Sequence, residues 1–92
     1  MRSCIYKYLM PDPGRADSVY MPVGAEILDV QMQNGNIEAW ALVDADQYMN
    51  KERTFFTVGT GQLFPYDNVP IEHLGTVQNN GKVWHVFEVM KP

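Results

Sequence analysis

Apolar and polar residues alternate along most of this chain, and a two-residue period is typical of β-strands. The clearest alternation runs from Glu26 to Gln33. Leu28, Val30 and Met32 share one face of this segment, and polar residues share the other. Helical periodicity is nearly absent, so the pattern predicts a protein built almost wholly from strands.

Two hairpins are predicted from turns rich in asparagine and glycine. Asn34-Gly35-Asn36 and Asn79-Asn80-Gly81 both tolerate the positive φ angles that tight hairpin turns need. The strand after the first turn, Ile37–Val43, is apolar on both faces, which indicates a central position in its sheet. Further strands are predicted at Cys4–Leu9, Ser18–Met21, Arg53–Val58, Ile71–Gln78 and Lys82–Met90.

Two breaks separate these strands. Asp44–Glu52 is polar, and it is compatible either with a single helical turn capped by its first aspartate or with a loop. Gln62–Pro70 contains two prolines, and its aromatic residues predict an ordered loop packed onto the surface. The short links and the strand spacing predict a small antiparallel β-sandwich or barrel of six or seven strands, forming one domain over residues 1–92.

Charge and cysteine content narrow the classes of partner. The chain has 7 basic and 11 acidic side chains and a net charge of −4, which disfavours general binding to nucleic acid or to anionic membranes. Cys4 is the only cysteine, so no intrachain disulfide and no site built on several thiolates can form. No segment has the length of a signal-peptide core or of a bilayer span, and we expect a cytoplasmic location.

The size of the chain favours self-association. A domain of 92 residues has little surface to bury, and packing against copies of itself would add buried area. We therefore expect a homo-oligomer.

The two histidines do not have the spacing of a metal-binding motif. His73 and His85 lie on different strands of one predicted hairpin. A residue near position 75 is expected opposite His85, so that His73 misses His85 by about one pleat. We expect no shared metal site, and we expect a backbone carbonyl to satisfy His85.

Two other segments could bind ions but have simpler explanations. Asp44-Ala45-Asp46 could hold a hard cation, but the glycine and the terminal glutamate of a calcium loop are missing at the required spacing. Gly59-Thr60-Gly61 could form a backbone nest for phosphate, with Arg53 as the nearest cation. It lacks the lysine and the following helix of a P-loop, and a tight turn with positive φ is the favoured interpretation.

No catalytic constellation is visible. Cys4 has no activating neighbour in the sequence, and Ser3 and Ser18 lie outside any nucleophile-elbow motif. We expect a non-enzymatic protein without cofactors. Trp40 and Tyr66 each neighbour a polar loop and could stack a nucleotide ring, although packing in a small core would equally explain the aromatic residues.

Seven segments, in order along nearly the whole chain, form a recognisable pattern: Ile5–Tyr8, Met21–Leu28, Val30–Gly35, Trp40–Asp44, Gly59–Gly61, Leu74–Thr76 and Val83–Glu88. Together they resemble a family of short proteins from tailed bacteriophages and prophages. Ala45 departs from that pattern, because proline is expected after Asp44. The resemblance implies a phage setting and assigns no activity.

These observations lead to one hypothesis and two rivals. The hypothesis is a phage-encoded, non-enzymatic protein of the host cytoplasm that antagonises a host defence process by sequestering a small nucleotide-type ligand or a host protein. The rivals are a virion or assembly component and an enzyme acting on a nucleotide or phosphoester. In the predicted ligand site, aromatic rings stack, Arg53 neutralises an anion and Thr60 donates hydrogen bonds. The predicted residues are Trp40, Asp44, Arg53, Thr60, Tyr66 and His85.

Overall fold

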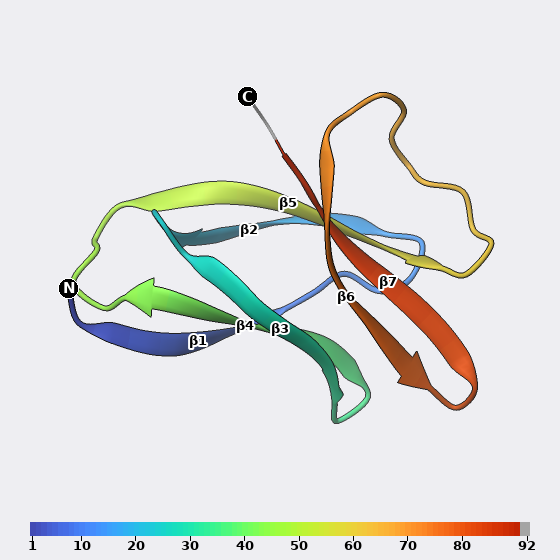
Figure 1. Cartoon of the computed structure of the whole chain (residues 1–92), viewed down its shortest axis with the longest axis horizontal. Coiled ribbons are helices and arrows are strands. Elements are labelled where there is room, and N and C mark those ends of the chain that lie inside the picture. The colour runs from blue at the N-terminus through green and yellow to red at the C-terminus, as the bar shows by residue number, and fades with distance from the viewer. Residues whose placement is uncertain (91–92) are drawn as a thin grey trace.

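Every segment predicted to be a strand is a strand in the computed structural model, which describes residues 1–90 (Figure 1). The strands are β1 (Ser3–Leu9), β2 (Ala16–Pro22), β3 (Glu26–Gln33), β4 (Asn36–Asp44), β5 (Asn50–Gly59), β6 (Ile71–Asn79) and β7 (Lys82–Val89). They form a three-stranded sheet in the order β1-β4-β3 and a four-stranded sheet in the order β2-β5-β7-β6. All neighbours pair antiparallel. The predicted antiparallel sandwich is confirmed, with two sheets instead of a closed barrel.

Both predicted hairpins close through two-residue turns. The turns are Asn34-Gly35 and Asn80-Gly81, in which φ is 52° at both asparagines and 81° at both glycines. Positive φ at both central residues defines the type I′ turn, whose twist matches that of the flanking strands. Asn36 and Asn79, which the sequence analysis placed in the turns, are the terminal residues of β4 and β6 instead.

Strand β4 is central in its sheet, as predicted, because β1 and β3 pair with its two edges. Ala39 and Ala41 face the other sheet and are fully buried. The expected alternation fails in β3, where a bulge shifts the register between Ile27 and Asp29. Leu28 is consequently 50% exposed and does not share the buried face of Val30, contrary to the prediction.

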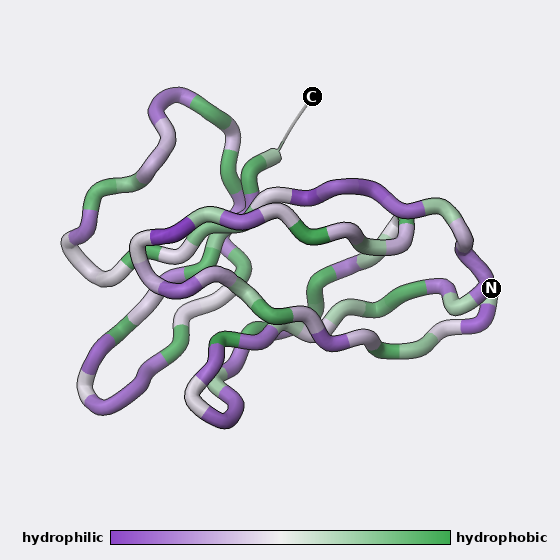
Figure 2. The backbone as a smooth tube through the Cα atoms, turned by 180° about the vertical axis from the view of Figure 1, so that it is seen from behind, coloured by the Kyte–Doolittle hydropathy of each residue, from purple (hydrophilic) through white to green (hydrophobic). Residues whose placement is uncertain are grey.

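The hydrophobic core lies between the two sheets, and β3 packs against β6 across the gap between them (Figure 1). Coloured by hydropathy, the backbone shows apolar positions interrupted by polar ones along the strands, as expected when each strand has one buried face (Figure 2). Phe56 is also fully buried, but on the outer face of the four-stranded sheet, under Phe64 and Tyr66. The other large, fully buried side chains are Phe55, Met10, Met21, Val43, Val86 and Thr57.

The predicted break at Gln62–Pro70 is a loop throughout. Of the predicted break at Asp44–Glu52 only residues 45–49 are a loop, because Asp44 ends β4 and residues 50–52 belong to β5. Residues 45–49 begin with a turn in which the Gln47 amide donates to the Asp44 carbonyl (3.0 Å), so the loop alternative holds there and the helical turn does not. The longer loop follows β5 and returns to β6, standing out from the sandwich in Figure 1. Within residues 1–90, no helix has the length and apolar character to cross a membrane.

Candidate functional site

Two histidines and two threonines form a hydrogen-bonded chain on the outer face of the four-stranded sheet. Thr60 Oγ1 lies 2.8 Å from His85 Nε2, His85 Nδ1 lies 3.2 Å from Thr76 Oγ1, and Thr76 Oγ1 lies 3.0 Å from His73 Nε2. The chain forms because Thr76 on β6 is directly opposite His85 on β7. The neighbouring Val86 belongs to the core between the sheets, so alternation turns His85 outward.

This arrangement tests two expectations about the histidines. His73 pairs with Phe87, two residues from His85, which confirms that the two imidazoles are one pleat apart. Hydroxyl groups, and not a backbone carbonyl, satisfy His85, because both of its ring nitrogens contact threonine. Within residues 1–90, no three His, Cys, Asp or Glu side chains are grouped so that they could hold a metal ion.

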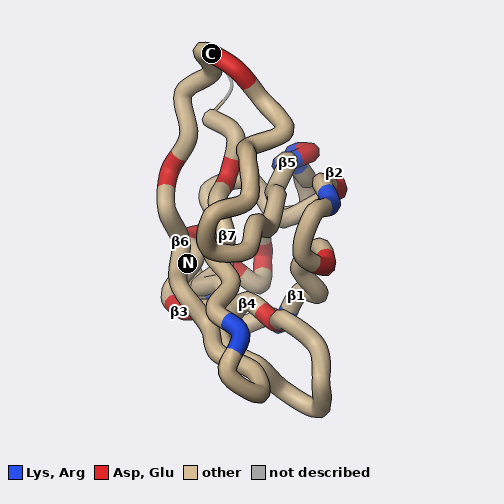
Figure 3. The backbone as a smooth tube through the Cα atoms, turned by 90° about the vertical axis from the view of Figure 1, so that its right-hand side faces the viewer, with Lys and Arg blue, Asp and Glu red and all other residues tan. Residues whose placement is uncertain are grey.

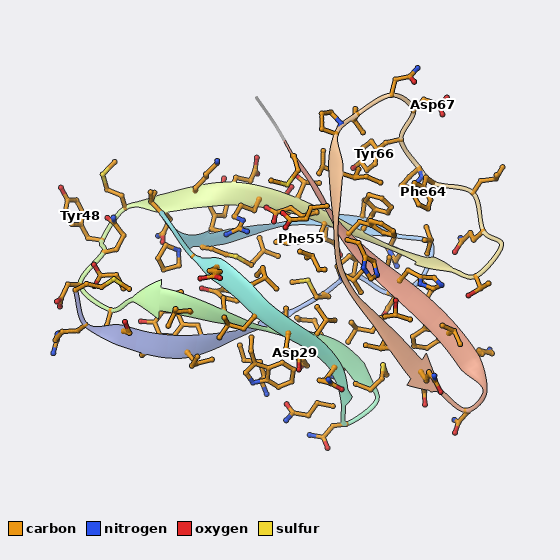
Figure 4. All side chains as sticks on the ribbon, viewed as in Figure 1. Asp29, Tyr48, Phe55, Phe64, Tyr66 and Asp67 are labelled. Carbon is orange, nitrogen blue, oxygen red and sulfur yellow. The ribbon has the colours of Figure 1, made fainter. Side chains whose placement is uncertain are left out.

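An aromatic cluster lies beside this chain of hydrogen bonds. Phe56 on β5 stacks on Phe87 on β7, with ring centroids 5.2 Å apart. Phe64 and Tyr66 come from the loop between β5 and β6, and their rings meet the Phe56 ring edge-on at 5.3 and 5.5 Å (Figure 4). The His73 ring lies 5.2 Å from Phe87 and joins the cluster to the histidines. The predicted packing of this loop onto the surface is confirmed.

Backbone amides of the turn that carries Thr60 are hydrogen-bonded within the protein. Gly61 has a φ of +86°, and the Gln62 amide donates to the Gly59 carbonyl (3.0 Å). The Gly59 amide donates to Gln62 Oε1 (2.9 Å), and the Thr60 amide donates to the Val83 carbonyl (3.2 Å). Two of the three amides of the predicted nest, those of Gly59 and Thr60, are therefore already hydrogen-bonded, and the tight-turn interpretation is confirmed.

Arg53 lies inside the sandwich and has its own charge partner. Its Nε and Nη2 donate to the two carboxylate oxygens of Glu88 at 2.6 and 2.7 Å, and its Nη1 donates to the Ala25 carbonyl at 2.6 Å. Only 16% of the Arg53 side chain and 7% of the Glu88 side chain are exposed. The hydrogen bonds to Glu88 raise the pKa of Arg53 above its ordinary value. Glu88 therefore binds one edge of the guanidinium and Ala25 takes a further donor, so Arg53 has an internal role in the sandwich.

The carboxylates of Asp44 and Asp46 both have partners within the protein. Asp44 Oδ1 accepts hydrogen bonds from the amides of Asp46 (2.9 Å) and Arg2 (3.2 Å). The amide of Asp46, followed by that of Arg2, lowers the pKa of Asp44 below its ordinary value. Asp46 forms an exposed ion pair with the Arg2 side chain at 2.7 Å. The motif thus ties the N-terminal strand to the end of β4.

The structure brings together three of the six predicted site residues. Thr60 and His85 are hydrogen-bonded, and Tyr66 packs on the same outer face. Trp40 is half-buried on the outer face of the other sheet, whereas Asp44 and Arg53 have the internal roles described above. No sequence pattern pointed to Thr76, Phe64 or Phe87 as site residues, and His73 was considered only as a partner of His85 in a metal site. Of these, Thr76 could have been found by assigning a two-residue turn, which places it opposite His85.

We name the solvent-facing part of this surface the aromatic–histidine face. An open hollow of about 410 Å³ adjoins it, lined by Thr60, Lys82 and Trp84 together with Gly59, Gly81 and Val83. The face consists of Thr60, Phe64, Tyr66, His73, Thr76 and His85.

These features define a small all-β sandwich with aromatic and imidazole groups gathered on one outer sheet face. All 92 residues match the model of one protein family, described as Domain of unknown function (DUF7352), and the chain belongs to that family. No curated protein and no solved structure matches the chain significantly. The predicted resemblance to a family is confirmed to this extent, and the phage setting stays a prediction.

Proposed function

We propose that this protein is a non-catalytic binding protein that occupies the surface of a partner protein with its aromatic–histidine face. The observation that carries the proposal is the exposure of large apolar groups beside hydrogen-bonding groups on this face. Phe64 is 45% exposed although its ring packs on Phe56, and Leu63 next to it is 89% exposed. Aromatic residues in such a setting are typical of the anchors in protein–protein interfaces.

The hydrogen bonds that already engage the reactive side chains favour a binding function over catalysis. Both nitrogens of His85 are engaged by hydroxyl groups, and Arg53 is engaged by Glu88. A catalytic histidine that activates a hydroxyl is typically oriented by a carboxylate, whereas within residues 1–90 the Thr76 hydroxyl contacts the second ring nitrogen of His85. Acidic positions recur along the backbone and basic ones are few, which disfavours a nucleic-acid partner (Figure 3).

The resemblance to tailed-phage proteins supplies the biological part of the proposal. In that setting the partner is a host protein of the cytoplasm, and sequestering it antagonises a host defence process. A binding protein of this kind needs only a specific surface, which a domain of 92 residues can present.

A pull-down with matched variants tests this function. Phe64→Lys places a charge in the aromatic–histidine face. Tyr48→Lys is the control, because Tyr48 is 88% exposed in a loop far from that face (Figure 4). We expect the same host protein to be recovered with the wild type and with Tyr48→Lys, and to be lost with Phe64→Lys. A partner retained equally by all three, or conversion of nucleotides in the presence of divalent metals, would contradict the proposal.

A small nucleotide-type ligand is the second candidate. The hollow lined by Thr60, Lys82 and Trp84 combines a hydroxyl, a cation and an aromatic ring, which are the groups that bind a phosphate and a base. Native mass spectrometry of protein from infected cells would detect such a ligand, and its intact recovery after denaturation would favour this candidate. Finding the chain in purified phage particles would instead favour a virion component.

A further inference from the structure

The outer face of the three-stranded sheet, opposite the core, has exposed apolar residues among charged and polar ones. Ile5 and Leu9 on β1 are 51% and 62% exposed, and Leu28 at the β3 bulge is 50% exposed. Trp40 and Leu42 on β4 are half-buried and lie in register with β1 and β3. We name this surface, made of Ile5, Leu9, Trp40 and Leu42, the β4 face. Exposed apolar sheet faces of this kind mark interaction sites.

A pair of opposite charges flanks the centre of the β4 face. Lys7 on β1 and Asp29 on β3 are both paired with Trp40, so the three residues form one row across the sheet. The Lys7 ammonium donates to Gln33 Oε1 at 2.7 Å. Asp29 accepts from the Val30 amide and from Gln31 Nε2.

Among the residues that the structure describes, neither charge has an ionic partner. Within residues 1–90, the ion pairs are Arg2–Asp46 and Arg53–Glu88. Lys7 and Asp29 are thus bonded to neutral groups, and each can take a partner of opposite charge from outside the chain.

We propose that two copies of this chain pack through their β4 faces about a two-fold axis that runs along β4. Rotation about such an axis places β1 of one copy over β3 of the other and keeps each residue at its level along the strand. Lys7 of one copy is then at the position opposite Asp29 of the second copy. Its ammonium leaves Gln33 to form the ion pair, and the reverse pair forms by symmetry. Trp40 meets its own equivalent between the two charge pairs.

The charges also select this arrangement over the other two-fold packing of the same face. An axis across the strands would stack Lys7 on Lys7 and Asp29 on Asp29, and like charges facing each other across an interface are destabilising. Face-to-face sheets with their strands nearly aligned pack about 10 Å apart, which brings facing side chains into contact. The axis along β4 is therefore the one that the charge pattern favours.

Two acidic residues oppose the association. Glu26 on β3 shares a row with Leu42 and Ile5, so the axis places it over Ile5 of the second copy. Glu38 lies on β4, on the same face as Trp40, and the proposed axis brings it close to its own equivalent. Glu38 is only 9% exposed, so its charge is already partly shielded from water. Neutralising it should tighten the dimer.

The area of the β4 face sets the affinity that we expect for the dimer. Three strands spaced by about 4.8 Å, with the length of β4, present roughly 15 by 30 Å. This is less than the ~800 Å² that each partner buries in a standard complex. We therefore expect a dimer that dissociates on dilution in the micromolar range.

A charge-swap experiment tests this proposal on the full chain. The variants are Lys7→Glu and Asp29→Lys, and sedimentation velocity over about 1 μM to 1 mM measures the association. Each variant alone places like charges opposite each other, so we expect its Kd for dimerisation to rise at least about tenfold. An equimolar mixture restores both opposite-charge pairs, and we expect native mass spectrometry to show the mixed dimer. Glu38→Gln should lower the Kd.

The controls separate this surface from other effects. Lys51→Glu reverses an exposed charge on β5 of the other sheet and should leave the Kd unchanged. Thermal unfolding confirms that each variant is folded. A wild type that stays monomeric at about 1 mM would overturn the proposal, as would a dimer that tolerates both reversals or a mixture of folded variants that does not associate. The aromatic–histidine face lies on the other sheet, so loss of dimerisation and loss of partner binding can be measured independently of each other.

Discussion

Gly75 on β6 lies directly against Val30 on β3, so that a Cβ atom at Gly75 would be 3.0 Å from the Cβ atom of Val30. The two strands belong to different sheets and share no hydrogen-bonded ladder. The absence of a side chain at Gly75 therefore sets how closely the sheets approach at this edge. Any side chain there would push β3 and β6 apart, because both contacting atoms lie near the backbone.

We predict that Gly75→Ala lowers the free energy of unfolding by about 1–3 kcal/mol through overpacking. The chemical denaturation midpoint measures this change. Gly59→Ala is the matched control, because the nearest atoms to a Cβ there are 3.8 Å and 3.9 Å away. Removing the contacting Cβ atom with Val30→Gly should make the Gly75→Ala change less costly. Equal costs of Gly75→Ala in both backgrounds would show that the contact is not the cause.

The Arg53–Glu88 pair joins β5 to β7 inside the sandwich, and removing one partner leaves the other charge buried. We predict that Glu88→Gln lowers the free energy of unfolding by about 3 kcal/mol, because the guanidinium loses its two carboxylate contacts. Replacing both residues, as Arg53→Met with Glu88→Leu, should cost less than the single change. Urea denaturation measures all three proteins. A loss under about 1 kcal/mol for Glu88→Gln would mean that water already screens the pair.

The strands could be predicted because alternation and turn residues act locally. Asn34-Gly35 and Asn80-Gly81 specify their turns by their own φ preferences. The β3 bulge could not be predicted in this way, because nothing in the alternation marks the extra residue at Leu28. A bulge is a compromise between the ladder and the twist of the sheet, and it is settled only when both strands are in place.

The candidate site was predictable only within one hairpin. Thr76 and His85 share the β6–β7 hairpin, so a correct turn length is enough to pair them. Arg53 and Glu88 lie on strands far apart in sequence, and no local signal gives the register of β5 against β7. Arg53 was accordingly assigned to an anion site, whereas it is bound by a carboxylate of its own chain.

Thr57 is fully buried, and its hydroxyl has no hydrogen-bond partner within the described residues. We predict that Thr57→Val raises the free energy of unfolding by about 1 kcal/mol, because a methyl group replaces an unsatisfied polar group. Thr57→Ser is the control, since it keeps the hydroxyl, loses a methyl group and should be destabilising. Thermal unfolding distinguishes them. A less stable Val variant would reveal that the hydroxyl has a partner in solution.

The Thr76 hydroxyl bridges His73 and His85 on the surface of the sheet. We predict that Thr76→Val changes the imidazole ¹⁵N chemical shifts of both histidines, because each ring loses a hydrogen bond. The free energy of unfolding should change by less than about 0.5 kcal/mol, since the site is exposed. Thr54→Val is the control: its hydroxyl pairs with Ser18 on the same sheet, and it should leave the imidazole signals unchanged. Unchanged signals in Thr76→Val would mean that the hydrogen bonds from Thr76 to the two histidines are not formed in solution.

Asp44 makes folding stability depend on pH in the acid range. Hydrogen bonds from the Asp46 and Arg2 amides lower its pKa in the folded state below the ordinary value of 3.8. The folded protein therefore holds the ionised form more strongly than the unfolded chain does. The resulting stabilisation is present above the unfolded pKa and is lost as pH falls through the folded one. We predict a smaller fall in stability below about pH 4 for Asp44→Asn than for the wild type. Asp67→Asn, in the exposed loop labelled in Figure 4, is the control and should follow the wild type in urea denaturation at each pH. If Asp44→Asn showed the same dependence of the free energy of unfolding on pH as the wild type, the acid sensitivity would come from other carboxylates.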